Sequence, residues 1–183
     1  MNIHQLSVNH DERQDRLLLR LNTQDLQEFR FWLTRRMSLR LLPAIEQSAK
    51  RLEAAQPGVA VTDAPSQQLL SELKRDAFLK KADFATPFEN RATQWPLGVE
   101  PLLITDAHLS IQPGGALEIS FEDKSDPAQA RSCQLHLQVG LVHGMAHLIR
   151  QASDKAEWLA VNSPTQATEA GPVQDQEPPR YAH

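Results

Sequence analysis

The sequence has a single cysteine and no long apolar run. The lone thiol, Cys133 in a chain of 183 residues, cannot form an internal disulfide. Because Cys133 alternates with Leu135 and Leu137, we expect a buried, unreactive thiol rather than a nucleophile. No stretch approaches the roughly 18 apolar residues that span a bilayer, and the first residues lack the basic start and apolar core of a signal peptide. The sequence therefore predicts a cytoplasmic protein without a membrane partner.

The sequence also lacks an excess of positive charge. It carries 19 Lys and Arg residues against 23 Asp and Glu residues, a formal net charge of -4. Such a balance creates no overall field that would draw the protein to nucleic acid or to an anionic membrane. A site for a polyanion would therefore have to be local.

Motifs of serine hydrolases and nucleotide-dependent enzymes are missing. The sequence contains no G-x-S-x-G pattern, which forms the nucleophile elbow of many hydrolases. Gly114 and Gly115 are too few to cradle a phosphate, and they lie between two strand-like segments as a hairpin turn would. We therefore expect no cofactor and no catalytic residues.

One order of elements occurs twice in the chain. In both copies, three short segments with alternating apolar and polar residues precede an amphipathic helix. The segments are 3–8, 16–22 and 28–33 before a helix from residue 35, and 102–112, 116–122 and 132–139 before a helix from residue 141. This order predicts an α+β fold: an antiparallel sheet of about six strands from two βββα halves, with the two repeat helices on one face.

The two halves, residues 3–55 and 102–159, are predicted to share one domain over residues 1–160, because a chain of this length usually builds one core. Residues 161–183 hold almost no large apolar side chains, so we expect a disordered tail.

The connection between the halves has two predicted parts. A helix is expected at residues 66–84 with Ser66 as its cap, and it either covers the sheet or presents a surface. Residues 85–101 combine three prolines with Phe88, Trp95 and Leu97, which indicates an extended segment strapped onto the core.

Local signals define the first helix. Thr34 is a plausible N-cap, since its hydroxyl can accept a hydrogen bond from an amide of the first turn. Pro43 lacks an N–H and crowds the preceding turn, so we expect it to kink or split this helix.

The best candidate site is the outward face of the second and third segments. Arg16, Leu18 and Arg20 share one side of the second segment, and Arg30 and Trp32 share one side of the third. Tryptophan and arginine are enriched in the hot spots of protein interfaces. The predicted interaction face comprises Arg16, Leu18, Arg20, Arg30, Trp32, Arg35 and Arg36. It favours a non-catalytic protein-interaction module that binds a protein partner or a second copy of the chain.

Two other interpretations of this face stay open. Its arginines could neutralise phosphates while Trp32 stacks on a base, which would make the chain a single-stranded nucleic-acid binder. Glu28 on the adjoining turn and the acidic chain weaken that hypothesis. The face could also be an ordinary sheet surface covered by the inserted helix.

His143 and His147 are the only metal candidates that the sequence offers. They lie one helical turn apart, as do the histidines of the HExxH zinc proteases, but Gly144 stands where the catalytic glutamate should be. That difference removes the protease chemistry and favours two histidines that flank a core stripe. A metal-dependent enzyme using this pair is the remaining alternative.

Overall fold

The computed structural model describes residues 2–55, 64–82, 86–126, 128 and 130–159. The predicted disordered tail at 161–183 and the end of the predicted insertion, including Phe84, lie outside these residues. The first half of the chain forms β1 (Ile3–Asp11), β2 (Arg16–Thr23), β3 (Glu28–Thr34) and α1 (Arg35–Ala54). The connection contains α2 (Ala64–Lys81) and β4 (Leu102–Leu103), and the second half forms β5 (Asp106–Ile111), β6 (Ala116–Asp123), β7 (Arg131–Gln138) and α3 (Val139–Lys155).

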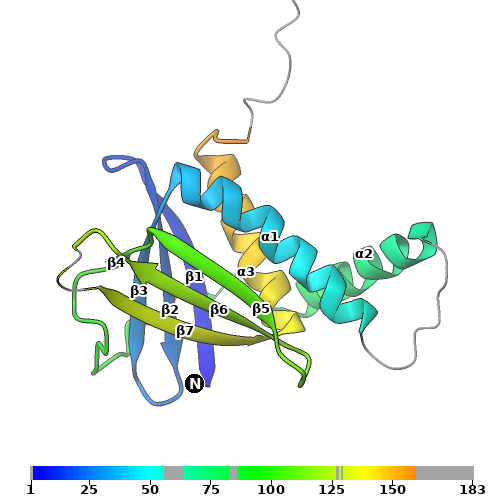
Figure 1. Ribbon diagram of the computed structural model, residues 1–183, viewed down its shortest axis with the longest axis horizontal. Helices are drawn as coiled ribbons and strands as arrows, with labels where there is room; N and C mark the ends of the chain where they lie inside the picture. Colours follow the sequence, from blue (N-terminus) through cyan, green and yellow to red (C-terminus); the bar gives the residue numbers. More distant parts are fainter. Residues whose placement is uncertain (1, 56–63, 83–85, 127, 129, 160–183) are drawn as a thin grey trace, which may run out of the picture.

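The fold is α+β, as predicted, but its strands do not form one sheet of six. Within the described residues they form a four-stranded sheet of order β1-β2-β3-β4 and a three-stranded sheet of order β5-β6-β7 (Figure 1). All strand pairs are antiparallel except β3 with β4. The order β-β-β-α is present in both halves, and an origin by duplication stays a prediction from that order.

The prediction of a single sheet is wrong because residues 102–112 are not one strand. Leu102 and Leu103 pair in parallel with Phe31 and Trp32, and the Ile104 N–H donates to the Trp32 carbonyl at 2.9 Å. The Thr105 N–H already donates to the Glu122 carbonyl of the second sheet at 2.9 Å. The chain thus passes between the sheets within two residues, and the second set of strands crosses the first instead of extending it (Figure 1).

The inner faces of both sheets pack into one cluster of buried side chains. The predicted alternation is confirmed, since Leu17, Leu19 and Leu21 are fully buried on β2. Phe31 of the first sheet meets Phe121 of the second with ring centroids 5.2 Å apart. Full burial of each such side chain contributes about 1.5–3 kcal/mol of transfer free energy, so the core joins the two halves.

Helices α1 and α3 lie side by side and antiparallel, and both contact strands of the two sheets (Figure 1). The Thr34 cap is confirmed, because its Oγ1 accepts from the Met37 N–H at 3.2 Å. Pro43 does not split α1, which runs unbroken through it. Pro43 and Leu39 are exposed, so water can satisfy the carbonyl four residues before the proline.

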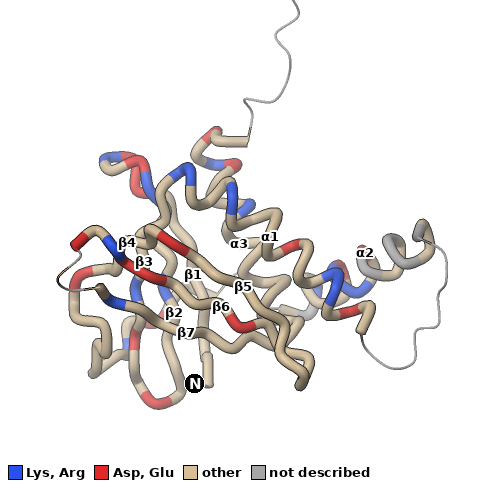
Figure 2. The backbone as a smooth tube through the Cα atoms, in the orientation of Figure 1, with Lys and Arg blue, Asp and Glu red and all other residues tan. Residues whose placement is uncertain are grey.

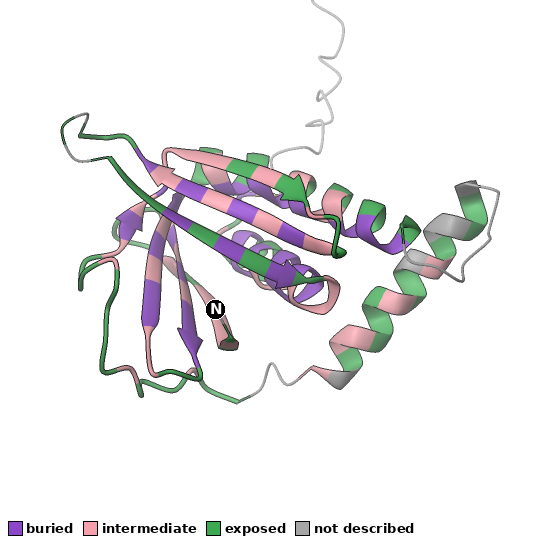
Figure 3. Cartoon of the chain, turned by 60° about the horizontal axis from the view of Figure 1, so that its bottom comes forward, coloured by how far each residue is buried: buried purple, intermediate pink, exposed green. Residues whose placement is uncertain are grey.

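Helix α2 stands away from the sheets (Figure 3). It begins at Ala64 rather than at Ser66, and none of its described side chains is buried. Phe78 anchors its end on α3: a Cβ added at Gly140 would lie 2.7 Å from Phe78 Cε2, and one at Gly144 would lie 3.5 Å from Phe78 Cε1. The two glycines therefore make room for the ring. No helix in the described part of the chain is long and apolar enough to cross a membrane.

Candidate interaction surface

The predicted interaction face lies on the side of β2 and β3 that points away from the core. The register pairs Arg16 with Thr34, Leu18 with Trp32, and Arg20 with Arg30. These residues are half-buried, whereas the alternate residues of both strands are buried. Arg35 and Arg36 are exposed in the first turn of α1, next to the Arg16 end of the face. The seven residues therefore form a strip along β2 and β3.

At one end of this strip, Arg20 and Arg30 bind a buried carboxylate. Glu28 is 2 % exposed, and its Oε1 accepts from Arg20 Nε at 2.7 Å and from Arg30 Nε at 2.9 Å. Arg30 Nη2 donates to the second oxygen at 3.2 Å. Glu28 is the first residue of β3, as the predicted segment 28–33 has it, and does not lie on the adjoining turn. These three residues form an Arg–Glu–Arg cluster within the protein.

Burial and hydrogen bonding act in opposite directions on Glu28. Burial alone would raise the pKa of its carboxyl, but the hydrogen bonds from Arg30 and Arg20 outweigh it and hold the pKa below the ordinary value of 4.5. The same hydrogen bond raises the pKa of the Arg30 guanidinium. The cluster therefore keeps all three charges at neutral pH.

Residues 86–101, which we call the strap, cover this end of the sheet. Two backbone hydrogen bonds fix the strap to the turn before β3: Thr93 N–H donates to the Leu26 carbonyl and Glu28 N–H to the Gln94 carbonyl, each at 2.9 Å. Arg20 Nη2 donates to Asn90 Oδ1 at 2.6 Å. The strap predicted from the prolines and aromatics is thus present. The strap, and not the inserted helix, covers this part of the outer face of β2 and β3.

Aromatic side chains of the strap lie against the same two arginines. The Arg20 guanidinium carbon is 4.2 Å from the centroid of the Phe88 ring, and that of Arg30 is 5.9 Å from the centroid of Trp95. Arg30 Nη1 also donates to the Val99 carbonyl at 3.2 Å. Trp95 and Val99 nevertheless remain 37 % and 60 % exposed. The strap therefore covers Arg20 and presents new apolar surface beside Arg30.

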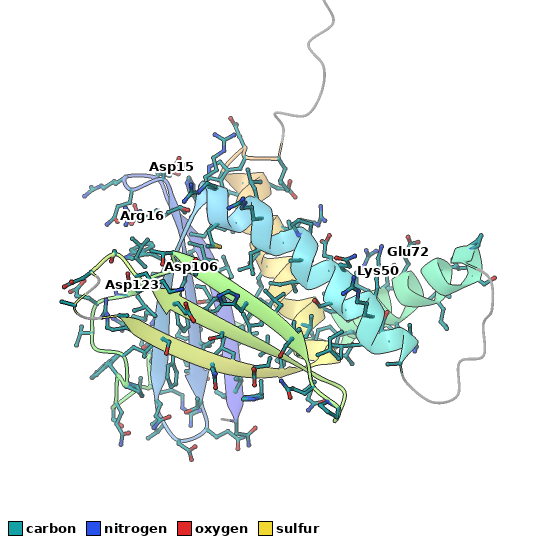
Figure 4. All side chains as sticks on the ribbon, in the orientation of Figure 1. Asp15, Arg16, Lys50, Glu72, Asp106 and Asp123 are labelled. Atoms are coloured by element: carbon teal, nitrogen blue, oxygen red, sulfur yellow. The ribbon has the colours of Figure 1, made fainter. Side chains whose placement is uncertain are left out.

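The other end of the strip is open and carries both signs of charge. Arg16, Arg35 and Arg36 lie near the β1–β2 hairpin, where Asp11 and Asp15 add negative charge (Figures 2 and 4). Between the two ends, Leu18 and Trp32 face each other across the strands. We call the set Leu18, Arg30, Trp32, Trp95 and Val99 the Trp95 surface, in which Arg30 contacts both strap residues. The site predicted from the sequence did not include Trp95 and Val99. The feature that could have indicated them is a tryptophan in a segment that has few residues in the core.

His143 and His147 do not form a site with the strip. His143 is buried on α3, and its Nε2 donates to Glu53 Oε1 of α1 at 2.9 Å. His147 is half-buried one turn further on. Across the residues that the structure describes, no group of three or more His, Cys, Asp or Glu side chains is arranged to hold a metal ion. The paired ring of His143 is thus an element of α1–α3 packing.

Both histidines line a groove of about 560 Å³ between α1, α2 and α3, which we call the three-helix groove. Six of its eleven lining residues are charged, of both signs, including Lys50 and Glu72 on facing helices (Figure 4). Arg150 and Glu46 form an ion pair there. Opposite charges that neutralise one another give this groove no preference for a ligand of one sign.

Cys133 behaves as the sequence predicts. It is 9 % exposed, and burial raises the pKa of its thiol to about 11. A thiol with that pKa carries almost no thiolate at neutral pH and is a poor nucleophile.

No family model, no curated protein and no solved structure matches this chain. Its function must therefore be inferred from the geometry of its own residues.

Proposed function

We propose that this chain is a non-catalytic protein-interaction module that binds its partner through the Trp95 surface. The observation that carries the proposal is the pair Trp95 and Val99, both exposed on a segment that backbone hydrogen bonds hold against the sheet. A large aromatic side chain on a fixed backbone loses little entropy on binding and buries a large apolar area.

Arg30 supplies the polar part of this surface. Its guanidinium is held by Glu28 and by the Val99 carbonyl, so it is already oriented before a partner arrives. Its side chain remains about one quarter exposed, at 25 %. An oriented arginine beside Trp95, on the same strand face as Trp32, has the composition of an interface hot spot.

The charges favour a protein partner over a nucleic acid. Glu28 neutralises part of the charge of Arg20 and Arg30, and Asp11 and Asp15 lie at the end that holds Arg16. Phosphate binding draws on uncompensated cations, and its affinity falls with each one that is lost. A single-stranded nucleic-acid binder is therefore the less supported alternative.

Photo-crosslinking tests the proposal directly. A benzophenone side chain replaces Trp95 in one variant and Ile111 in the control, since Ile111 is 40 % exposed but lies on β5 of the other sheet. Both variants are irradiated as purified protein and in cells of the source organism, and adducts are resolved by mass. We expect a discrete protein adduct at position 95, either a second copy of the chain or another protein, and none at position 111.

Affinity measurements complete the test with the partner so identified. Trp95→Ala should weaken association by about 2 kcal/mol or more, the size of a hot-spot truncation. Ile111→Ala should leave the dissociation constant unchanged. Equal crosslinking at both positions, or a discrete adduct with nucleic acid alone, would refute the proposal.

A further inference from the structure

Strand β1 forms one edge of the four-stranded sheet. Two hydrogen bonds show which of its residues direct their N–H and C=O groups toward β2 and which direct them away from it. The Gln5 N–H donates to Asn22 Oδ1 of β2 at 2.9 Å, and the Thr23 N–H donates to the Gln27 carbonyl on the β3 side at 2.9 Å. Successive residues of a strand direct their N–H and C=O groups to opposite sides. The backbone groups of Leu6, Val8 and His10 therefore point away from β2, toward the edge where no strand of the described residues pairs with β1.

A groove of about 420 Å³ runs along this edge, and we call it the β1 groove. Helix α3 supplies one wall through a stripe of residues three and four apart. The end of α2 and the start of the strap supply the rest. The lining residues are His4 to Asn9 of β1, Leu141, Gly144, Leu148 and Gln151 of α3, Phe78 and Ala82, and Thr86 to Phe88.

The β1 groove differs from the three-helix groove in charge. None of the described residues that line it is Lys, Arg, Asp or Glu, whereas six of eleven are charged in the three-helix groove. Glu89 and Arg91 lie against His4 at one end of the β1 groove. A charged group placed further along, between Leu6 and Leu148, would lose water without gaining a counter-ion from the lining residues, which is costly. The groove therefore selects for an uncharged occupant.

The strap limits the width of the groove. Gln5 Nε2 donates to the Pro87 carbonyl at 3.5 Å, and the Glu89 N–H donates to Gln5 Oε1 at 3.0 Å. These bonds hold the strap across the outer side of β1, opposite the α3 wall. The β1 groove thus lies between a strand edge and α3, and the strap bounds its outer side. A groove of this shape fits an extended peptide better than a folded domain.

We infer that the β1 groove binds an extended, uncharged peptide segment of a partner protein as an additional strand. The peptide backbone pairs with the outward groups of Leu6 and Val8, and every second side chain packs on Leu141 and Leu148 of α3. Main-chain hydrogen bonds give such a complex its affinity, and the helix wall gives its preference for apolar side chains at alternate positions. The inference goes beyond the proposed function, because it uses a surface on the opposite edge of the sheet from β4.

A display library of random seven-residue peptides is the probe. It is panned on the full-length protein, and the selected peptides are measured by fluorescence polarisation. We expect uncharged sequences with apolar residues at alternate positions. Enrichment of charged sequences, or no enrichment, would overturn the inference.

Two variants locate the selected peptides. Val8→Pro removes an N–H that points away from β2, so no β1–β2 hydrogen bond is lost. An edge strand tolerates proline at such a position. Leu148→Glu places a carboxylate in the α3 wall, with Leu39→Glu on exposed α1 as its matched control. Each groove variant should weaken peptide binding by about tenfold or more, the equivalent of losing one well-made interaction. Leu39→Glu should not change it.

Folding and self-association are measured on the same samples. Circular dichroism melts confirm which variants are folded, so that Leu148→Glu still decides the question if Val8→Pro fails to fold. Peptides that bind the wild type and the folded groove variants equally would place their site elsewhere. A concentration-dependent dimer in light scattering that Val8→Pro abolishes would show a second copy at the edge and would replace the peptide as occupant. Either result leaves the Trp95 surface untouched.

Discussion

The outer faces of the two sheets differ although their inner faces are alike. Both sheets bury alternate Leu, Ile and Phe residues, such as Leu19 and Phe31 in the first and Ile119 and Phe121 in the second. The first sheet covers the end of its outer face with the strap and holds a buried Glu28 there. The outer face of the second sheet is exposed along β7 in the part of the chain that the structure describes, and Glu118 and His136 pair there at 2.9 Å.

This difference follows from the connection between the halves. The strap leads to β4, and on the way it contacts the outer side of the first sheet at Gln5, Arg20 and Arg30. The strap contacts Arg20 and Arg30 through side-chain hydrogen bonds and Glu28 through its backbone N–H. The corresponding face of the second sheet is exposed along β7. On the first sheet the strap instead helps to bury the Arg–Glu–Arg cluster and adds the apolar side chains of Trp95 and Val99 to the surface.

Removing Glu28 should give the largest effect on stability. Glu28→Ala leaves Arg20 and Arg30 partly buried without their common carboxylate. Breaking a buried ion pair costs about 3–5 kcal/mol, and we expect the lower end of that range because the two arginine side chains stay 18 % and 25 % exposed. Urea unfolding at neutral pH measures the free energy of unfolding. A loss below about 1 kcal/mol, typical of a surface substitution, would mean that the Arg–Glu–Arg cluster does not stabilise the outer face of the first sheet.

Acid should remove the ionic part of this stabilisation. The pKa of Glu28 is lower in the folded chain than its ordinary value of 4.5, so its charge stabilises the fold fully above that pH. The stabilisation is lost as the pH falls through the lowered folded pKa, where the carboxyl gains a proton. The free energy of unfolding is measured for the wild type and Glu28→Gln from pH 7 to pH 2. The gap between the two should be widest near pH 7 and narrow below pH 4.5, whereas parallel curves would assign the stabilisation to another group.

The comparison of the halves also extends to their helices. Helix α3 carries Gly140 and Gly144 under Phe78 of α2, whereas α1 contains no glycine. Gly140→Ala places a methyl group 2.7 Å from the Phe78 ring, so the ring or the end of α2 that carries it must shift. Gly144→Ala makes an ordinary contact at 3.5 Å and gains helix propensity.

We expect Gly140→Ala to be about 1–3 kcal/mol less stable than Gly144→Ala, the range for overpacking, because Gly140 lies in the first turn of α3 and gains no more helix propensity than Gly144 in the interior. Urea unfolding measures the difference. Hydrogen exchange at residues 64–82 should be faster in Gly140→Ala than in Gly144→Ala. Equal exchange and equal stability would show that Phe78 does not anchor α2.

Local periodicity accounts for what was predictable. The alternation of Leu17, Leu19 and Leu21, the direction of Arg30 and Trp32, and the Thr34 cap each depend on residues close in sequence, and the structure confirms them. The break after Leu103 was not predictable, because it depends on which strands lie near Trp32 and Glu122 in space.

The candidate site was predictable only in part for the same reason. Outward direction follows from alternation, but the cover on Arg20 comes from Phe88 and Asn90, about seventy residues away along the chain. Glu28 is acidic and close to a turn, which favours exposure. The burial of Glu28 is stable because the register of β2 and β3 places Arg20 opposite Arg30, where both can bind its carboxylate.

The exposed pair on the second sheet should give the smallest effect. Glu118 and His136 lie on neighbouring strands with their side chains 26 % and 54 % exposed, and water already solvates both. Pairs of this kind contribute about 0–1 kcal/mol and less at high salt. Glu118→Ala should therefore change the free energy of unfolding by no more than about 0.5 kcal/mol at neutral pH, as is usual for surface substitutions. If this substitution instead approaches the cost of Glu28→Ala in the same urea titration, the outer face of the second sheet is not open, and the contrast between the two halves fails.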